Sequence, residues 1–180
     1  SNEFYKKLGA KGLSDQVSTY RANGDIQLLK RLSKKTDEIL DLACGYGRIT
    51  IPMKKAGYKI TGIDLAPNLI QEARRQAKKQ KVNVKFDIGS MAKLPYPNES
   101  FDTIFCLWSS FNHLLTTKEQ VKALNEMHRV LKPGCLAFLE MFNAEKKKIR
   151  EKLKKEGQGA DKRLWGEVFN GAKNLDYMHS

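Results

Sequence analysis

The sequence predicts an α/β protein in which helices cover both faces of a doubly wound, mainly parallel sheet. Five strand-like apolar runs, each but the last followed by a helix, imply right-handed β-α-β units. The run over 101–108 is almost continuous in apolar residues, as expected of a strand that is covered on both faces. A length of 180 residues suits one domain with a sizeable core, which agrees with this fold class.

The first part of the chain is predicted to begin with a helix and a strand. Residues 24–35 carry apolar side chains at helical spacing, and a short strand over 39–43 ends in a glycine turn. The next helix must begin near 48–49, because Pro52 fits only into a first turn, where its missing N–H needs no partner. Gly57 is expected to end that helix.

The middle of the chain continues the alternation. A second strand is expected over 58–64, and Pro67 suits the first position of a helix that runs to about residue 80. A third strand is expected over 82–88. The two prolines of 93–100 exclude regular structure from the loop that leads to the fourth strand.

The last predicted helix covers 117–131 and precedes a fifth strand over 135–142. Thr117 and Gln120 are expected to form its capping box, and the K-P-G sequence after it to end the helix. The face that this helix turns toward the core is expected to contain Val121, Leu124, His128 and Leu131.

The net charge of +13 comes largely from the lysine-rich segments 74–81 and 145–157. A basic surface attracts nucleic acid or anionic substrates. Lysine-rich helix faces also keep proteins in solution, and we favour this second interpretation.

Cysteine usage indicates the compartment. Cys44, Cys106 and Cys135 lie far apart, without a C-x-x-C pair or a cluster with histidine. They predict reduced thiols in a cytoplasmic protein, with neither disulfides nor a metal site. No apolar run approaches the length that spans a bilayer, and no signal peptide is expected at the start of the sequence.

A carboxylate and a glycine turn lie at the end of the first strand. In sheets of this kind ligands bind outside the carboxyl ends of the strands, where strand order reverses. Gly45 and Gly47 let the backbone pass close to a ligand, and the N–H groups that open the next helix face the same space. Asp64, seventeen residues after Gly47, closes the second strand, where a carboxylate can accept hydrogen bonds from ribose hydroxyls.

The remainder of the ligand is inferred from Asp41 and Thr50. A nicotinamide site would have a third glycine where Thr50 stands. Asp41 would repel a pyrophosphate beside the turn, but it would attract the ammonium group of an amino acid. A ribose at one end and an amino acid at the other describe S-adenosylmethionine.

The segments "ILDLACGYGR", "GIDLAP", "FDIGSMAKLPYPNESFDTIFCLWSSFNHL" and "LNEMHRVLKPGCLAFLE" cover the chain between residues 36 and 142. Together they resemble the class I S-adenosylmethionine-dependent methyltransferases of the small-molecule, ubiquinone-type group. The resemblance implies a Rossmann-like sheet of strand order 3-2-1-4-5 over 36–142. It also implies a helical cap over 1–35 and a helical extension over 143–180 in which the usual carboxyl-terminal hairpin is missing or incomplete. An uncovered last strand would favour a homodimer through the sheet edge or the carboxyl-terminal segment.

Carried over by position, the resemblance assigns cofactor contacts to ten residues. The methionine end would be lined by Asp41, Ala43, Gly45 and Gly47. The ribose and adenine would meet Asp64, Leu65, Ser90 and Met91, and the transferring methyl group would lie over Leu107 and Trp108. Ser90 replaces an acidic residue that is usual in the family, so we expect weaker cofactor binding. Ala66 replaces a common capping serine, at a cost of roughly 1 kcal/mol of helix stability.

His113 and Tyr20 are the candidate catalytic residues. His113 follows the fourth strand at the mouth of the crevice, where it could accept a proton from the substrate or cap the next segment. Tyr20, like Tyr5, belongs to the amino-terminal segment that often folds over the substrate in this family. We interpret five other conspicuous side chains as buried, surface or packing residues: Cys44, Arg48, His128, Trp165 and Phe169.

The expected reaction is methyl transfer from S-adenosylmethionine to nitrogen or oxygen of a small-molecule acceptor by in-line displacement, which leaves S-adenosylhomocysteine. No metal and no membrane partner are expected. Two alternatives stay open: an RNA or tRNA methyltransferase, which the positive charge would favour, and a non-catalytic S-adenosylmethionine-binding module. A nicotinamide oxidoreductase is a more distant third.

Overall fold

The computed structural model describes residues 19–141. The helices in this range are α2 (Thr19–Leu32), α3 (Thr50–Lys55), α4 (Pro67–Lys79), the 3-10 helix η1 (Ser110–His113) and α5 (Thr117–Val130). The strands are β1 (Glu38–Leu42), β2 (Lys59–Asp64), β3 (Lys85–Ile88), β4 (Phe101–Cys106) and β5 (Leu131–Leu139). The predicted extension over 143–180 and most of the predicted cap, with Tyr5, Trp165 and Phe169, lie outside the described residues.

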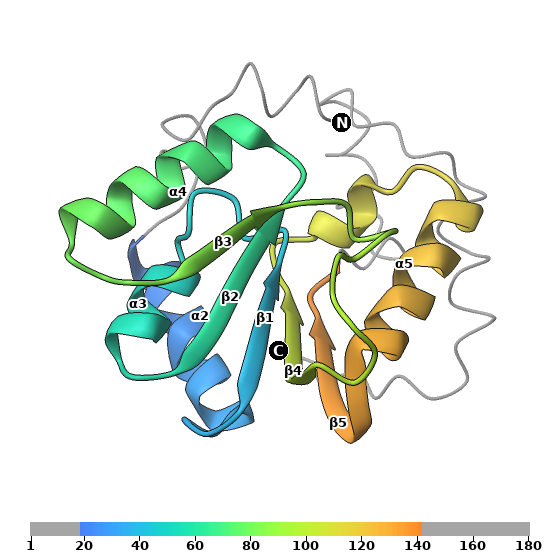
Figure 1. Cartoon of the computed structure of the whole chain (residues 1–180), viewed down its shortest axis with the longest axis horizontal. Helices are drawn as coiled ribbons and strands as arrows, with labels where there is room; N and C mark the ends of the chain where they lie inside the picture. The colour runs from blue at the N-terminus through green and yellow to red at the C-terminus, as the bar shows by residue number, and fades with distance from the viewer. Residues whose placement is uncertain (1–18, 142–180) are drawn as a thin grey trace.

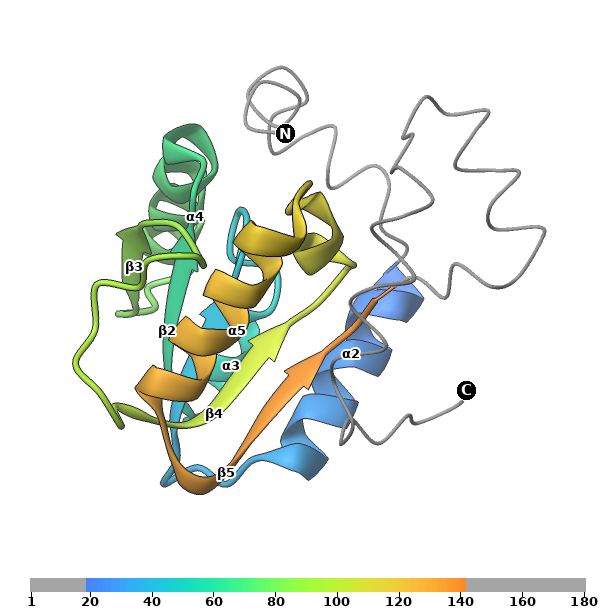
Figure 2. The ribbon, with the colours of Figure 1, turned by 90° about the vertical axis from the view of Figure 1, so that its right-hand side faces the viewer.

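The five strands form one parallel sheet of order β3-β2-β1-β4-β5, which confirms the predicted fold class and strand order. Helix α5 covers one face of the sheet, and α2, α3 and α4 cover the other (Figures 1 and 2). The strand order reverses between β1 and β4. The carboxyl ends of these two strands therefore border the position where ligands bind in sheets of this kind.

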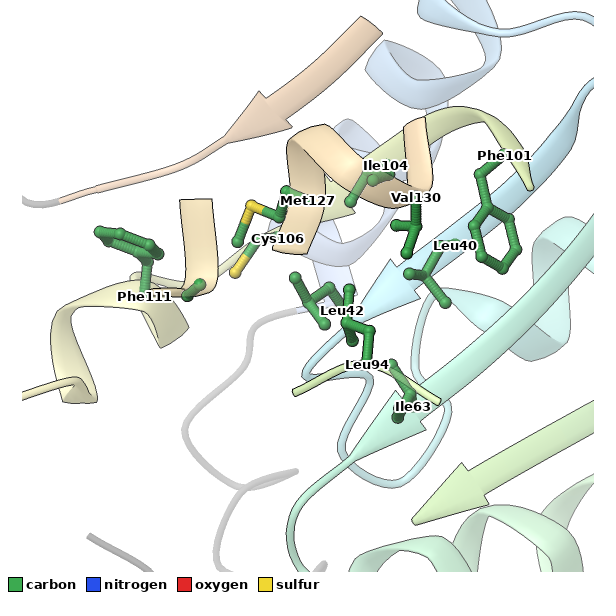
Figure 3. Close-up of a cluster of buried hydrophobic side chains, with 11 residues drawn as sticks. Leu40, Leu42, Ile63, Leu94, Phe101, Ile104, Cys106, Phe111, Met127 and Val130 are labelled. Atoms are coloured by element: carbon green, nitrogen blue, oxygen red, sulfur yellow. The ribbon is translucent and has the colours of Figure 1, made fainter. Parts of the chain in front are cut away.

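Apolar layers on both faces of the sheet hold the helices. On one face, Leu40 of β1 belongs to a buried cluster with Met127 of α5 (Figure 3). On the other face, Ile39 of β1 and Phe105 of β4 cluster with Leu29 of α2. Because successive side chains of a strand point to opposite faces, strands covered on both faces must be apolar at nearly every position. This explains the continuous apolar runs of the sequence.

Three of the predicted helix starts and ends are confirmed, one of them with a small shift. Helix α3 begins at Thr50, one or two residues later than expected, and Pro52 lies in its first turn. Gly57 closes this helix in a left-handed conformation, with a φ of 91°. Pro67 opens α4, and Ala66 before it makes no side-chain cap.

The connection from β3 to β4 corrects the expectation that a helix follows every strand but the last. Residues 89–100 form a loop, in which Ser90 and Lys93 make an isolated antiparallel bridge. Pro95 and Pro97 lie in this loop, where their fixed φ and missing N–H groups are incompatible with a helix interior. The loop therefore crosses from β3 to β4 without a helix of its own.

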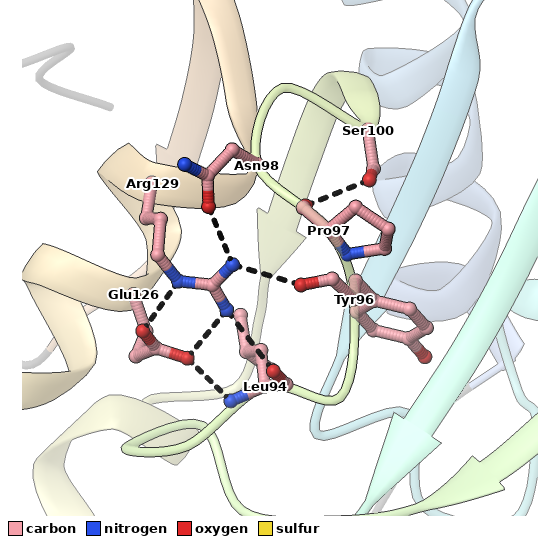
Figure 4. A network of polar contacts seen from close by, with 7 residues as sticks. All are labelled: Leu94, Tyr96, Pro97, Asn98, Ser100, Glu126 and Arg129. Carbon is pink, nitrogen blue, oxygen red and sulfur yellow. Dashed lines mark hydrogen bonds and ion pairs between the residues drawn. The ribbon is translucent and has the colours of Figure 1, made fainter.

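Arg129 of α5 fixes this loop to the helix (Figure 4). Its guanidinium donates hydrogen bonds to the carbonyl oxygens of Leu94 at 3.0 Å and Tyr96 at 2.8 Å, and to Oδ1 of Asn98 at 3.0 Å. Glu126 pairs with the same guanidinium at 2.7 Å and accepts the N–H of Leu94 at 2.7 Å. Three polar backbone groups of the loop, on Leu94 and Tyr96, find hydrogen-bond partners in this way.

The capping box of α5 lies one residue earlier than expected. The hydroxyl of Thr116 accepts the N–H of Glu119 at 3.2 Å, and the Glu119 carboxylate accepts the N–H of Thr116 at 3.2 Å. The prediction of Thr117 and Gln120 is therefore wrong. An acidic side chain at the third helical position completes the box with a negative charge beside the helix N-terminus.

The face of α5 that packs on the sheet differs in part from the expected one. Leu124 and Leu131 pack against the core cluster as predicted, whereas Val121 and His128 do not. Val121 is 48% exposed, and His128 is exposed instead of being a buried structural residue. The helix ends at Val130, and Leu131 already belongs to β5, which includes the K-P-G sequence. Ala123, Met127 and Val130 instead belong to the buried cluster between α5 and the sheet. The buried residues of α5 are Gln120, Ala123, Met127 and Val130.

The longest helices among the described residues have 14 residues, and none of them is long and apolar enough to cross a membrane.

Candidate active site

The turn after β1 combines three left-handed residues. Ala43, Gly45 and Gly47 have φ values of 63°, 56° and 82°. A Cβ at Gly47 would lie 2.9 Å from the ring of Phe86 and 3.0 Å from Ile51, so close packing against β3 and α3 requires glycine there. Among the described residues, apart from the two chain neighbours of Gly45, no atom lies within 4 Å of the Cβ position at this glycine. The turn therefore faces space that the described residues leave open. The predicted close approach of a ligand has room at Gly45.

Asp64 ties the glycine turn to the end of β2. Its Oδ2 accepts the N–H of Gly45 at 2.8 Å, and its Oδ1 accepts the N–H of Ala66 at 2.8 Å. Burial raises the pKa of this carboxyl, and the hydrogen bonds from the backbone act in the opposite direction. A carboxylate oxygen with one N–H partner keeps acceptor capacity for a hydroxyl. Asp64 is thus oriented by the turn at the position predicted for the ribose.

Asp41 lies buried beneath the same turn, with 3% of its surface exposed. Its Oδ2 accepts the hydroxyl of Thr50 at 2.6 Å. Burial raises the pKa of Asp41 to about 6, while the hydrogen bonds from Thr50 and the charge of Arg48 lower it. In the sequence Thr50 is conspicuous only as the residue that replaces the third glycine of a nicotinamide site. Its hydroxyl now emerges as the donor that orients Asp41.

Cys44 lies between these two carboxylates in the sequence and is buried, as predicted. Burial and the negative charges of Asp41 and Asp64 raise the pKa of its thiol, which keeps it protonated. The thiols of Cys44, Cys106 and Cys135 are free. Among residues 19–141 no cluster of side chains suits a metal ion.

Two exposed apolar side chains flank Asp64 on the predicted adenine side. Leu65 is 48% exposed, and Ile88 at the end of β3 is 49% exposed. Ile88 pairs with Asp64 in the sheet register, so it lies beside the predicted ribose site. Ile88 is not among the cofactor contacts predicted from the sequence. Its position at the carboxyl end of β3, where ligands bind in parallel sheets, could have identified it. Ser90 accepts the N–H of Ala92 at 3.2 Å through its hydroxyl.

The segment just after β4 is the second predicted wall of the candidate site, and the glycine turn is the first. Leu107 is buried and Trp108 is half-buried, and both lie just beyond the strand. Trp108 and Ser109 are left-handed, with φ values of 58° and 54°. Consecutive non-glycine residues in this region store strain and are typical of functional sites.

Arg48 corrects its interpretation as a surface residue. Its side chain is 14% exposed and lies 2.7 Å from Oδ2 of Asp25 on α2. The guanidinium carbon also lies 4.5 Å from the centroid of the Trp108 ring. Arg48 therefore connects the glycine turn to α2 and to the segment after β4.

The two candidate catalytic residues differ in what the structure describes. His113 ends η1 and is half-buried, and burial lowers its pKa, which favours the neutral imidazole that a general base requires. Tyr20 lies in α2, but its side chain is outside what the structure describes. Both roles remain predictions.

Comparison with known families decides the class of protein. The model of the family described as "Methyltransferase domain" matches residues 39–134, which is more than half of the chain. The chain belongs to this family. The resemblance to class I S-adenosylmethionine-dependent methyltransferases is thereby confirmed, and S-adenosylmethionine is the cofactor of this group.

The chain aligns with only part of each curated relative. A "Probable methyltransferase ltbC" from Aspergillus luteorubrus is 32% identical over 72% of this chain and 48% of its own length. A "Demethylmenaquinone methyltransferase" from Deinococcus radiodurans is 32% identical over 62% of this chain and 45% of its own. The chain thus spans about half the length of these curated relatives.

Solved structures with the same fold include two from archaea. The PH0226 protein from Pyrococcus horikoshii OT3 has a TM-score of 0.68 at 26% identity, over 88% of this chain and 70% of its own. A SAM-dependent methyltransferase from Methanosarcina mazei has a TM-score of 0.62 at 29% identity, over 69% of this chain and 62% of its own. These similarities support the assignment of the methyltransferase domain.

The described residues of the domain fit an adenosyl group joined to an amino acid. Open space faces Gly45, and the Asp64 carboxylate beside it is already oriented. Leu65 and Ile88 present apolar surface on the side of Asp64 that the adenine would occupy. Asp41 supplies a second carboxylate beneath the turn.

Proposed function

We propose that this chain carries the cofactor site of a methyltransferase that acts on nitrogen or oxygen of a small-molecule acceptor. The observation that carries the proposal is the 2.8 Å hydrogen bond from the N–H of Gly45 to Oδ2 of Asp64. It fixes a carboxylate beside an open glycine turn, at the carboxyl end of a parallel strand. A nucleoside bound there would meet a preorganised acceptor for its ribose hydroxyls.

S-adenosylmethionine, when bound, supplies the methyl group and a good leaving group. The protein therefore contributes alignment and exclusion of water. In this proposal Asp64 accepts the ribose hydroxyls, and Leu65 and Ile88 pack on the adenine. Asp41 provides negative potential for the amino-acid end, assisted by its partner Thr50.

The acceptor side of the proposed site lies beyond β4. Leu107 and Trp108 form an apolar wall that keeps water from the reacting atoms. His113, at the end of η1, takes the proton that a nitrogen or oxygen acceptor releases. Its lowered pKa supports this role because a base must be neutral before it acts.

A small-molecule acceptor is supported by the relatives. The Deinococcus radiodurans protein bears the name demethylmenaquinone methyltransferase, and 62% of this chain aligns with it. The net charge of +13 supports the alternative, an RNA or tRNA acceptor. The free thiols of Cys44, Cys106 and Cys135 support a cytoplasmic location.

Calorimetric titration with S-adenosylmethionine and S-adenosylhomocysteine tests the proposed site. We expect binding by the wild-type chain and a loss of about tenfold or more for Asp64→Ala, because a hydrogen bond to a charged group is lost. Glu38→Gln is the matched control, since its exposed ion pair with Lys59 lies at the other end of the strands. Undiminished binding by an Asp41→Ala/Asp64→Ala double variant would refute the site.

Turnover separates the enzyme from a binding module. We expect S-adenosylhomocysteine to form when the chain is incubated with S-adenosylmethionine and a metabolite extract. Production that requires RNA and is suppressed by heparin would favour the nucleic-acid alternative. Tight cofactor binding without product on either substrate pool would favour the non-catalytic module.

A further inference from the structure

Three side chains that are distant in the sequence meet at one carboxylate oxygen. Oδ2 of Asp25 lies 2.7 Å from Nη1 of Arg48 and accepts the indole N–H of Trp108 at 3.1 Å. The guanidinium of Arg48 also stacks over the Trp108 ring, 4.5 Å from its centroid. Asp25 belongs to α2, Arg48 follows the glycine turn, and Trp108 follows β4. Helix α2 therefore contacts both walls of the candidate site through a single side chain.

The burial of these groups makes the contacts stronger than a surface ion pair. The side chains of Arg48 and Asp25 are 14% and 17% exposed. Charge-assisted hydrogen bonds are stronger than neutral ones, and partial exclusion of water weakens their screening. A cation over an indole face adds a further attraction. The three side chains thus form one unit instead of three independent contacts.

The backbone of Trp108 requires such a unit. Its φ of 58°, with 54° at Ser109, is a conformation that persists in non-glycine residues only where the surroundings fix it. Asp25 fixes the indole of Trp108, and Oε2 of Glu140, just after β5, accepts its backbone N–H at 3.0 Å. Two carboxylates from opposite ends of the described chain thus hold this residue.

We infer that Asp25 is a positioning residue of the methyl-transfer site, which holds the glycine turn through Arg48 and the segment after β4 through Trp108. Loss of its charge releases both partners together, so both walls of the site loosen. The expected weakening of cofactor binding rests on the proposed function. The expected loosening of the glycine turn and of the segment after β4 does not.

Hydrogen exchange of the full chain tests this inference. Asp25→Asn removes the charge at nearly constant size, and we expect about tenfold faster amide exchange in both 45–50 and 108–110. Asp25→Glu, which keeps the charge, should retain much of the protection. Glu38→Gln, the matched change at an exposed ion pair, should exchange like the wild type.

Tryptophan fluorescence and cofactor affinity give two further readouts. In a Trp165→Phe background Trp108 is the remaining tryptophan, and Asp25→Asn should shift its emission to longer wavelength as the indole becomes wetter. The same change should weaken S-adenosylmethionine binding about tenfold, with partial rescue by Asp25→Glu.

Faster exchange confined to α2 would overturn the inference, because Asp25 would then anchor only its own helix. If Asp25→Asn does not fold, Trp108→Phe removes only the indole donor. It should loosen 108–110 and leave 45–50 protected, and unchanged exchange in 108–110 would also overturn the inference. A wild-type chain that binds no S-adenosylmethionine would refute the proposed function, while the exchange data would still decide the role of Asp25.

Discussion

The hydroxyl of Thr50 donates a 2.6 Å hydrogen bond to Oδ2 of Asp41, and both side chains are buried. Thr50 opens α3 and Asp41 lies in β1, so the bond joins the helix to the strand on either side of the glycine turn. Burying a carboxylate without a hydrogen-bond donor costs folding free energy. The hydroxyl of Thr50 lowers this cost and so allows an acidic residue beneath the turn.

Replacing Thr50 by valine removes the hydroxyl and keeps the shape of the side chain. We expect Thr50→Val to lower the free energy of unfolding by about 2 kcal/mol at pH 7, because a buried charge loses its hydrogen bond. Urea unfolding measures this loss. In an Asp41→Asn background the same change should cost much less, since no charge remains, and additive losses would contradict the coupling.

The raised pKa of Asp41 predicts a pH-dependent stability. Its pKa is about 6 in the folded chain and 3.8 ordinarily, so the folded state holds the proton more tightly than the unfolded state. This contribution is complete below about pH 3.8 and is lost as the pH rises through 6. The loss corresponds to about 3 kcal/mol of folding stability.

The measurement compares the wild type with Asp41→Asn, because other carboxylates titrate in both chains and cancel in the difference. Asp102 and Glu126, for example, have lowered pKa values caused by Lys132 and Arg129, and they act in the opposite direction. The stability of Asp41→Asn relative to the wild type should increase by about 2 kcal/mol between pH 4 and pH 7. A difference that stays constant over this range would show that burial does not raise this pKa.

The elements that the sequence predicted well are those with local signals. Short apolar runs identified all five strands, and Pro67 and Gly57 marked the start of α4 and the end of α3. The acidic residues and glycines of the candidate site were predicted because each stands at or near a strand end. Such signals depend only on neighbours in the chain.

The features that the sequence did not predict depend on contacts between distant elements. Two neighbouring stripes of α5 have helical spacing, and the one with Ala123 and Met127 is the fully buried one. Arg48 looked like a surface residue because its partners, Asp25 and Trp108, lie on other elements. Thr50 occupies the position of the third glycine in the dinucleotide-binding pattern. Its role as hydrogen-bond donor to Asp41 follows only from the contact between the two side chains.

The end of α4 offers a stability test that is independent of the candidate site. Lys81 follows this helix with a φ of 56°, and the N–H groups of Lys81 and Val82 bond back to Lys78 and Ala77 at 3.0 and 2.9 Å. This is the position where helices prefer glycine. We expect Lys81→Gly to raise the free energy of unfolding by about 1 kcal/mol, because the left-handed strain of a side chain is removed.

Lys79→Gly provides the matched control, since Lys79 still belongs to α4, as its last residue. That change should lower stability by about 1 kcal/mol through the poor helix propensity of glycine. Thermal unfolding of both variants under the same conditions distinguishes the two effects. A loss of stability in Lys81→Gly would mean that the lysine side chain contributes more than its strained backbone costs.

The two glycines of the turn should respond differently to alanine, because their surroundings differ. At Gly47 a Cβ would lie 2.9 Å from Phe86 and 3.0 Å from Ile51, at a φ of 82°. Gly47→Ala should therefore destabilise the fold by about 2 kcal/mol or more through overpacking and backbone strain. At Gly45 the Cβ would meet open space, so only the left-handed backbone opposes it, with a cost of about 1 kcal/mol.

For cofactor affinity we expect the opposite order, with Gly45→Ala more damaging than Gly47→Ala, if the ligand binds on the open side of the turn. The Cβ of Gly45→Ala would occupy the space where the proposed ligand approaches the backbone. The free energy of S-adenosylmethionine binding should therefore weaken by more than the free energy of unfolding of this variant. Unfolding curves and calorimetric titrations of both variants provide the comparison. Gly45→Ala with undiminished affinity would place the ligand elsewhere, because a methyl group in direct contact with the ligand could not be neutral.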